Sequence, residues 1–520
     1  MEESWARYAG RSECLTYHDS SPVQAGVVSR DFPANGAMAQ NEVFRTPIPR
    51  SYMNNLSLLD LGFFITETEA SPKHVAGLMI CKRPAKSSVA FAKNLYTEYL
   101  AHTDVSAPFN RIINFSLAPV PHWQDTEVDL TRHIFFHKLK RGKNSREGLY
   151  DFVARLHSQM LDRSRPLWEV HVIDGLGEGR FALYQKMHHA YADGVTMTRW
   201  TAEGMAQSPR QMKLTPMWTR KHGGYVDRRK QKSQEMLQSV WQEVGGTSRR
   251  LLGIGRLAAM LLLESVSLTK NAIALPFVSS AKTPLTGQVT SGRQFSTAGV
   301  SMARVDRIRT LTRSTLNHVA LTCLDAALRR YLSDQGVELN RPIIIQMPVN
   351  LRKEGEKTAG NKLGIILVEL SPPTDDPYVR LRNIGFSLRN VRTMIDSVAP
   401  EAIESYTIIT GLVAQIAELL KLSNTLPPMG NTLVSNVPGP KQHLYVKGAK
   451  IEEMHPISTL PPSNLLNITL FSYAGDLFFG LVATDELPNL HRLGEYIQEA
   501  FAELENSVRD GNVASKARQA

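Results

Sequence analysis

The chain has 520 residues, of which 42% are hydrophobic, 21% are charged and 8% are aromatic. This composition argues against a disordered chain, a collagen-like fibre and a polytopic membrane protein. The length suits about three domains, or two of roughly 200 residues each. Cys14, Cys81 and Cys323 lie far apart and form no CxxC pair. The cysteines therefore support neither a zinc knuckle nor a dithiol redox site, and they fit a reducing compartment.

The excess of basic residues is concentrated in one strip. The net charge is +11, and residues 209–232 hold eight Lys or Arg against Asp227. Such a strip suits an anionic membrane surface, a phosphorylated substrate or a solvated linker. Its only aromatic residues are Trp218 and Tyr225, so we expect no nucleic-acid partner.

No segment has the composition of a secretory signal or of a membrane-spanning helix. The chain begins without a basic region followed by an apolar one. Its most apolar stretch, 251–263, is interrupted by Arg256 and is shorter than the roughly 20 residues that a spanning helix needs. We expect a cytoplasmic protein that is peripherally associated with the inner membrane or with lipid droplets.

The predicted elements begin after an extension. Residues 1–52 contain four prolines and no sustained period, which indicates loosely ordered sequence. Residues 53–205 form a first half, where alternation and apolar runs predict strands and the i, i+3, i+4 spacing predicts helices. The predicted strands are 75–81, 166–174 and 181–187, and the predicted helices are 149–162 and 195–205.

A linker and a second half follow. Residues 206–295 are first basic, then amphipathic, and end in Pro/Gly/Ser-rich sequence, which predicts an interdomain linker with its own helix. Residues 296–510 resume α/β sequence, and 511–520 form a tail. The second half is predicted to contain helices 321–332 and 490–504, strands 343–347 and 363–370, and a hairpin of 465–473 with 477–482.

The sequence His188-His189-Ala190-Tyr191-Ala192-Asp193-Gly194 lies between a predicted strand and a predicted helix. A histidine at neutral pH can accept a proton and activate an alcohol or amine for attack on a carbonyl. Asp193 could hold the loop by pairing with a cation, and Gly194 would permit a turn. The alternatives are structural histidines or metal ligands. Adjacent strand residues point to opposite faces and no HExxH pattern is present, so we expect no metal.

The sequence gives little support to covalent catalysis by a serine or to the binding of a nucleotide cofactor. There is no GxSxG elbow and no P-loop. Residues 253–258 match GxGxxA but follow Arg249 and Arg250 rather than a strand, so we interpret the match as chance. We expect no cofactor.

The HHxxxDG motif resembles the active-site motif of the CoA-dependent acyltransferase superfamily. Further segments, taken in order, resemble the bacterial wax ester synthase/acyl-CoA:diacylglycerol acyltransferase family from about residue 54 to about residue 508. These segments are PLWE at 166–169, TPLTG at 283–287, Asn317, PVNLR at 348–352, GNKLG at 360–364, SNVPGP at 435–440, LNI at 466–468 and SYAG at 472–475. The resemblance implies an α/β fold of two chloramphenicol acetyltransferase-like domains joined by a helical linker, with the active site in the cleft between them.

The resemblance also implies a reaction. A long-chain acyl-CoA and a fatty alcohol or diacylglycerol would meet at His189, the general base, which deprotonates the hydroxyl. The alkoxide would attack the thioester directly, without an acyl-enzyme, and a donor would stabilise the oxyanion. Membrane or lipid-droplet contact would suit such substrates.

The resemblance gives roles to further residues. His188 would shape the loop, and Asp193 would pair with Arg352 or Arg111. Trp168 would support the substrate pocket from beneath. The candidates for the oxyanion donor and its support are Asn317, Ser435 and Asn436. His318 departs from the family, which usually has Asp there.

Two alternatives remain open from the sequence. The same fold could transfer an acyl group to another acceptor, such as a polyketide-derived diol, a sugar or a carrier-bound amine. A non-catalytic protein of the lipid-droplet surface could also have kept the fold, although such a protein has no chemical need for a base.

Overall fold

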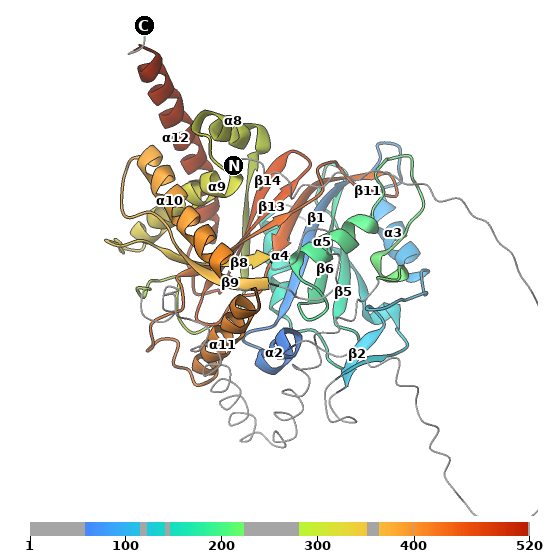
Figure 1. Ribbon diagram of the computed structural model, residues 1–520. Helices are drawn as coiled ribbons and strands as arrows, with labels where there is room; N and C mark the ends of the chain where they lie inside the picture. The colour runs from blue at the N-terminus through green and yellow to red at the C-terminus, as the bar shows by residue number, and fades with distance from the viewer. Residues whose placement is uncertain are drawn as a thin grey trace, which may run out of the picture. The chain divides into compact units, whose positions relative to one another are not determined.

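The computed structural model describes residues 58–114, 122–140, 146–222, 280–350, 363–398 and 400–517. The predicted extension 1–52, most of the predicted linker, and Arg352 lie outside the described residues. The described residues form two six-stranded sheets and a two-stranded one, with helices packed on them (Figure 1). The α/β class predicted from the sequence is confirmed.

The first sheet has the strand order β11-β12-β1-β6-β5-β4. Its central strands pair antiparallel, and His74 lies opposite His188 in that register. Helix α3 contributes Leu95 to the core on one face, and α4 contributes Leu149 to the core on the other. The bounds are β1 His74–Lys82, α3 Phe91–Leu100, β4 Ile134–Lys138, α4 Arg146–Ser158, β5 Trp168–Asp174, β6 Arg180–His188, β11 Tyr445–Val446 and β12 Ala449–Ile457.

The second sheet has the order β7-β14-β13-β10-β8-β9 and is mixed, since β10 pairs parallel with β13 and β8. The predicted hairpin is confirmed as β13 and β14, joined by Ala474 and Gly475, both with positive φ. Helices α9 and α12 pack on this sheet through Leu328 and Phe501. The bounds are β7 Gln294–Ser301, α8 Met302–Thr312, α9 Leu316–Ser333, β8 Ile344–Asn350, β9 Leu363–Glu369, α10 Pro377–Ser397, α11 Pro400–Leu419, β10 Thr432–Pro438, β13 Leu466–Tyr473, β14 Asp476–Ala483 and α12 Leu490–Ala517.

Strand β12 links the two sheets. It follows β10 of the second sheet in sequence, but it pairs antiparallel with β1 of the first, with Met79 opposite Met454. Residues that the sequence analysis assigned to the second half therefore complete the first sheet. The sequence of the segment 435–440 also fits a structural crossover. This segment leads from β10 of the second sheet toward β11 and β12 of the first.

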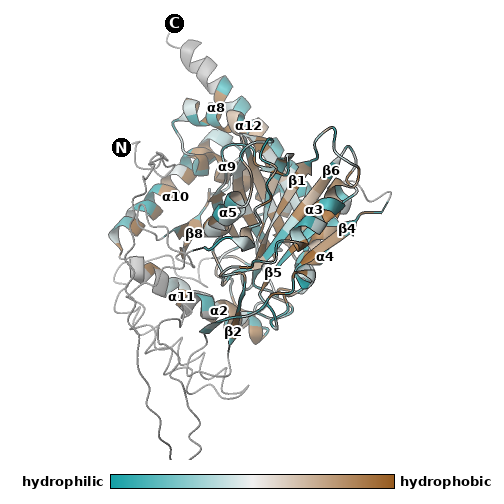
Figure 2. Cartoon of the chain, turned by 90° about the vertical axis from the view of Figure 1, so that its right-hand side faces the viewer, coloured by the Kyte–Doolittle hydropathy of each residue, from teal (hydrophilic) through white to brown (hydrophobic). Residues whose placement is uncertain are grey.

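Smaller elements surround the edges of the sheets. Helix α2 packs against α11 (Figure 1), and α5 follows β6 directly. Figure 2 shows the strands of the first sheet as largely hydrophobic, whereas α3 carries hydrophilic stretches. In the described ranges, no helix has the length and apolarity to cross a bilayer. The bounds are α2 Leu58–Thr66, β2 Arg111–Asn114, β3 His122–Asp125, α5 Gly194–Glu203 and the short 3-10 helices Leu130–Arg132 and Met217–Thr219.

Candidate active site

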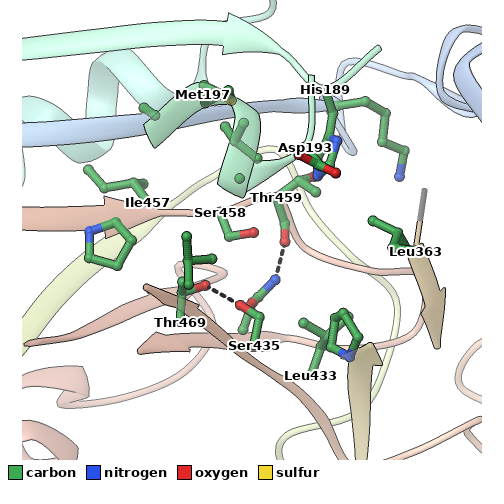
Figure 3. Close-up of a pocket in the computed structure, with 18 of the residues that line it drawn as sticks. His189, Asp193, Met197, Leu363, Leu433, Ser435, Ile457, Ser458, Thr459 and Thr469 are labelled. Carbon is green, nitrogen blue, oxygen red and sulfur yellow. Dashed lines mark hydrogen bonds between the residues drawn. The ribbon is translucent and has the colours of Figure 1, made fainter. Parts of the chain in front are cut away.

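A cavity of about 680 Å³ receives side chains from both sheets. Strands β1 and β6 with helices α2 and α5 form one wall, and β8, β9, β10, β12, β13, α11 and the segment 458–462 form most of the rest. Most lining residues are apolar, and His189, Asp193, Ser435 and Asn436 are polar exceptions. Figure 3 shows His189 and Asp193 on one side of the cavity and Ser435 on the other. Ligand pockets in proteins typically have this size and mixture of side chains.

His189 lies on the cavity wall, immediately after the last residue of β6. Its backbone N–H donates to the carbonyl of Lys73 at 2.8 Å, which continues the β1–β6 pairing by one residue. Its ring stacks on Phe63 of α2, with centroids 4.5 Å apart. Both contacts fix the direction of a half-buried imidazole, so the ring is presented to the cavity rather than to the core.

His188 points to the opposite side of the sheet and is fully buried. Its Nδ1 accepts from the backbone of Ala190 at 3.2 Å, its ring stacks on Phe64, and its Nε2 lies 3.5 Å from Oε1 of Glu67. The two histidines thus have separate surroundings, as the alternation of strand side chains predicts. The described residues include no group of three or more side chains placed to bind a metal.

Glu67 organises the region behind His189. Its Oε1 accepts from the backbone N–H of Lys73 at 2.9 Å, and its Oε2 accepts from Arg163 at 2.9 Å. Burial alone would raise the pKa of Glu67, but its contacts with His188, with the Lys73 amide and with Arg163 outweigh burial and lower the pKa to about 2. The carboxylate is therefore ionised at neutral pH, and it contacts both His188 and the Lys73 backbone at the start of the 188–194 segment.

Asp193 and Gly194 begin helix α5. The Asp193 side chain caps the helix by accepting from the Thr196 backbone at 2.9 Å. Gly194 does not have the positive φ that a special turn would require. A Cβ at this position would instead lie 3.2 Å from Cγ2 of Val437, so the glycine allows close packing between α5 and β10. The sequence analysis expected that a turn would require the glycine, and close packing against Val437 is the reason that the structure gives instead.

The polar candidates of the second half lie on the other cavity wall. Ser435 shares a 2.9 Å hydrogen bond with Thr469 (Figure 3). Asn436 lines the cavity and donates to Oδ1 of Asn317 at 2.7 Å. Asn317, at the start of α9, is not among the lining residues. The structure thus brings all three together, with Asn436 at the cavity and Asn317 behind it.

His318 takes part in the cap of α9. Thr315 is the N-cap residue and its hydroxyl accepts from the His318 backbone at 3.3 Å, while Nδ1 of His318 accepts from the Thr315 backbone at 3.5 Å. This is a capping box with histidine in the place of an acidic residue. Burial lowers the pKa of His318, with a smaller contribution from Arg389. The neutral ring can therefore serve as the acceptor.

The remaining predicted residues are more distant from the cavity. Trp168 is fully buried, donates to the carbonyl of Phe109 at 2.8 Å and stacks on Trp218 and His133. Arg111 forms an ion pair of 2.7 Å with Asp125. Its pairing with Asp193, like that of Arg352, stays a prediction.

Sequence reasoning missed Phe63, Glu67, Lys73 and Arg163, which all line the cavity. The first three belong to α2 or to the segment after it, and that segment carries no motif. One signal could have placed a residue opposite His189. If the alternation of strand β1 is extended by one residue to Lys73 and paired in register with β6, Lys73 lies opposite His189.

Two sequence profiles match this chain. Residues 56–320 match the wax ester synthase/diacylglycerol acyltransferase catalytic domain, and residues 359–505 match the WS/DGAT C-terminal domain. Together these segments contain every lining residue of the cavity except Pro348, Val349 and Asn350 of β8.

Relatives and solved structures agree with the profiles. A Mycobacterium tuberculosis protein assigned as a diacylglycerol O-acyltransferase is 30% identical over 459 residues, which cover 87% of this chain and all of the relative. A Mycobacterium bovis protein with the same assignment is 29% identical over 455 residues, covering 86% of this chain and 98% of the relative.

The structure of the wax ester synthase/diacylglycerol acyltransferase from Marinobacter aquaeolei VT8 superposes with a TM-score of 0.70 at 28% identity, covering 88% of this chain and all of that one. The first condensation domain of the calcium-dependent antibiotic synthetase shares the fold, with a TM-score of 0.54 at 13% identity, covering 88% of this chain and 98% of that one. The fold class is therefore that of the chloramphenicol acetyltransferase-like enzymes. With both profiles matched in order and relatives aligned over their whole length, the chain belongs to the wax ester synthase/diacylglycerol acyltransferase family and is an acyltransferase.

Proposed function

We propose that this enzyme transfers a long-chain acyl group from acyl-CoA to the hydroxyl of a diacylglycerol, with His189 as the general base. The observation that carries the proposal is the position of His189 on the wall of a largely apolar cavity lined from both sheets. The names of the mycobacterial relatives support the glyceride acceptor, and the name of the Marinobacter enzyme adds fatty alcohols.

The reaction needs one proton to move twice. The His189 imidazole accepts the proton of the acceptor hydroxyl as the oxygen attacks the thioester carbonyl. A C–O bond forms and the carbonyl oxygen becomes an oxyanion. The C–S bond then breaks, and the imidazolium returns the proton to the leaving thiolate. The hydroxyl itself is the nucleophile, so no covalent acyl-enzyme forms.

The opposite wall supplies the donors that the oxyanion requires. Asn436 lies at the cavity and is held by Asn317, and Ser435 lies one residue away on β10. Asn436 is the first candidate for the donor, with Asn317 fixing its amide. A donor aimed at the oxyanion contributes about 3 kcal/mol to the stability of the transition state.

The apolar chains of both substrates favour a peripheral position of the enzyme on a membrane or lipid droplet. The basic residues Arg228, Arg229 and Lys230, outside the described residues, would contact anionic lipid at about 1 kcal/mol each. Reversal of these three charges is expected to weaken binding to anionic liposomes in a sedimentation assay. Unchanged binding would contradict the assignment.

The test of the reaction is release of CoA thiol from palmitoyl-CoA by the purified full chain. The assay is run with dioleoylglycerol, with hexadecanol and without acceptor, and lipid products are separated by thin-layer chromatography. Acceptor-dependent release with triacylglycerol as product is the expected result. Release without acceptor, or no release with either acceptor, would overturn the proposed reaction.

A further inference from the structure

Lys73 faces His189 across the pair of strands. His74 is opposite His188 in the β1–β6 register, and the carbonyl of Lys73 accepts from the His189 backbone, so Lys73 and His189 are the next opposed pair. Opposed residues of antiparallel strands place their side chains on the same face, with Cβ atoms about 5 Å apart. Both residues line the cavity.

The Lys73 ammonium is buried with few partners. The residue is 4% exposed, and within the described part of the chain its Nζ makes one hydrogen bond, of 2.7 Å to Oγ of Ser71. A lysine ammonium has three donors, and burial makes the missing hydrogen bonds costly. A ligand in the cavity is the available source of acceptors.

The charge of Lys73 lies among other buried charges. Burial lowers the pKa of Lys73 to about 8, the carboxylates of Glu418 and Glu67 act in the opposite direction, and Arg293 adds to the lowering. The group therefore carries its charge at neutral pH, near two buried carboxylates, of which Glu67 is also paired with Arg163. Nζ of Lys73 still lacks hydrogen-bond acceptors, and a neutral carbonyl oxygen can supply one without adding charge to the site.

Gln415 of α11 presents a second unsatisfied donor to the same cavity. It is 2% exposed, and its Nε2 has no hydrogen-bond partner among the described residues. Glu418, one of the carboxylates that act on Lys73, lies three residues further along the same helix. Residues i and i+3 share a helix face, so Gln415 and Glu418 lie on the same side of α11, and Gln415 lines the cavity together with Lys73.

We propose that Lys73 and Gln415 form a subsite that binds the ester carbonyl oxygens of a diacylglycerol acceptor. This inference rests on the proposed function and names the feature by which that site selects its acceptor. In a diacylglycerol the nearest ester carbonyl lies a few bonds from the free hydroxyl. A hydroxyl at His189 therefore brings this carbonyl to Lys73. A linear fatty alcohol has no acceptor at that distance, and a site built to hydrogen-bond a group discriminates against ligands that lack it.

The experiment compares three acceptors with the full chain and palmitoyl-CoA. Dioleoylglycerol carries the ester carbonyls, a dialkylglycerol ether has the same hydroxyl and chains without carbonyls, and hexadecanol has a hydroxyl but neither the carbonyls nor the glycerol backbone. The variants are Lys73→Met and Gln415→Leu, with Lys93→Met on the exposed surface of α3 as the matched control. Thermal melting confirms that each variant is folded.

The subsite predicts that kcat/KM for dioleoylglycerol falls about tenfold in Lys73→Met, mainly through KM, and falls in Gln415→Leu as well. The ratio of dioleoylglycerol to dialkylglycerol activity should drop toward one in both variants and stay at the wild-type value in Lys93→Met. Equal losses with all acceptors, or a wild-type enzyme that uses both glycerides equally, would overturn the subsite while the acyltransferase reaction stands. Absence of activity with every acceptor would overturn the proposed function itself.

Discussion

Oε1 of Glu67 lies 3.5 Å from Nε2 of His188 and accepts a hydrogen bond from the Lys73 backbone at 2.9 Å. Since the Lys73 carbonyl in turn accepts from the His189 backbone, one carboxylate contacts both strands where the 188–194 segment begins. Glu67, from the segment after α2, thus fixes a loop that lies far away in the sequence.

Glu67→Gln is expected to lower kcat for acyl transfer about tenfold with KM changed less than about twofold, because the substitution loosens the position of the base and leaves the cavity intact. The measurement is steady-state CoA release with dioleoylglycerol. Glu69→Gln, two residues away and exposed, is the control and should retain wild-type kinetics. A fully active Glu67→Gln variant would show that the carboxylate does not position the loop.

The acid stability of the protein should depend on Glu453. Burial alone would raise the pKa of Glu453, but contacts with His455 at 2.9 Å and with Arg146 outweigh burial and lower the pKa to about 2. The folded-state pKa is below the ordinary value of 4.5, so the stabilisation is present above about pH 4.5 and is lost as pH falls toward 2.

Urea unfolding of the wild type and of Glu453→Gln, measured between pH 6 and pH 2.5, checks this dependence. The wild type should be the more stable of the two at pH 6, and the difference in the free energy of unfolding should shrink below about pH 4.5. A difference that stays constant over this range would contradict the assigned pKa.

Gly194→Ala should reduce both stability and activity. The added Cβ would lie 3.2 Å from Val437, so α5 or β10 must shift, at a cost of about 1 kcal/mol or more. The double variant with Val437→Ala removes the contact and should recover most of the loss. Thermal melting and CoA release of the two single variants and the double variant form the cycle, and additive effects would argue against this contact.

Asn436→Ala is expected to lower kcat by about 10²–10³ if its amide stabilises the oxyanion. Asn317→Ala should cause a smaller loss, and the double variant should be no worse than Asn436→Ala alone, since Asn317 acts by holding Asn436. Rates at saturating acyl-CoA give the comparison. A larger loss in Asn317→Ala than in Asn436→Ala would reverse these assignments.

Local patterns predicted much of the fold. The hairpin β13–β14 follows from two apolar runs around an Ala-Gly turn, and the strand–loop–helix context of HHxxxDG follows from the change of period around it. The crossing of β12 into the first sheet could not be predicted in this way. The sequence analysis predicts no strand at 449–457, and only tertiary packing decides which strand these residues pair with.

From the sequence, the site could be predicted only for the residues of the HHxxxDG motif. His188, His189 and Asp193 stand together in the sequence, whereas the contacts of Glu67 and Lys73 with them depend on the register of β1 against β6. The role of Gly194 likewise depends on Val437, which reaches it from the other sheet. Contacts of this kind leave no local periodicity to detect.

The proposed reaction has His189 as the base of a direct transfer. Its most direct test is the single-turnover rate of triacylglycerol formation for His189→Ala beside His491→Ala, an exposed histidine of α12, with intact-protein mass spectrometry of the quenched reaction. Direct transfer with His189 as the base predicts a loss of at least about a hundredfold in His189→Ala, wild-type rates in the control, and no acylated protein. A rate that survives in His189→Ala, or an acylated enzyme formed at the rate of turnover, would contradict it.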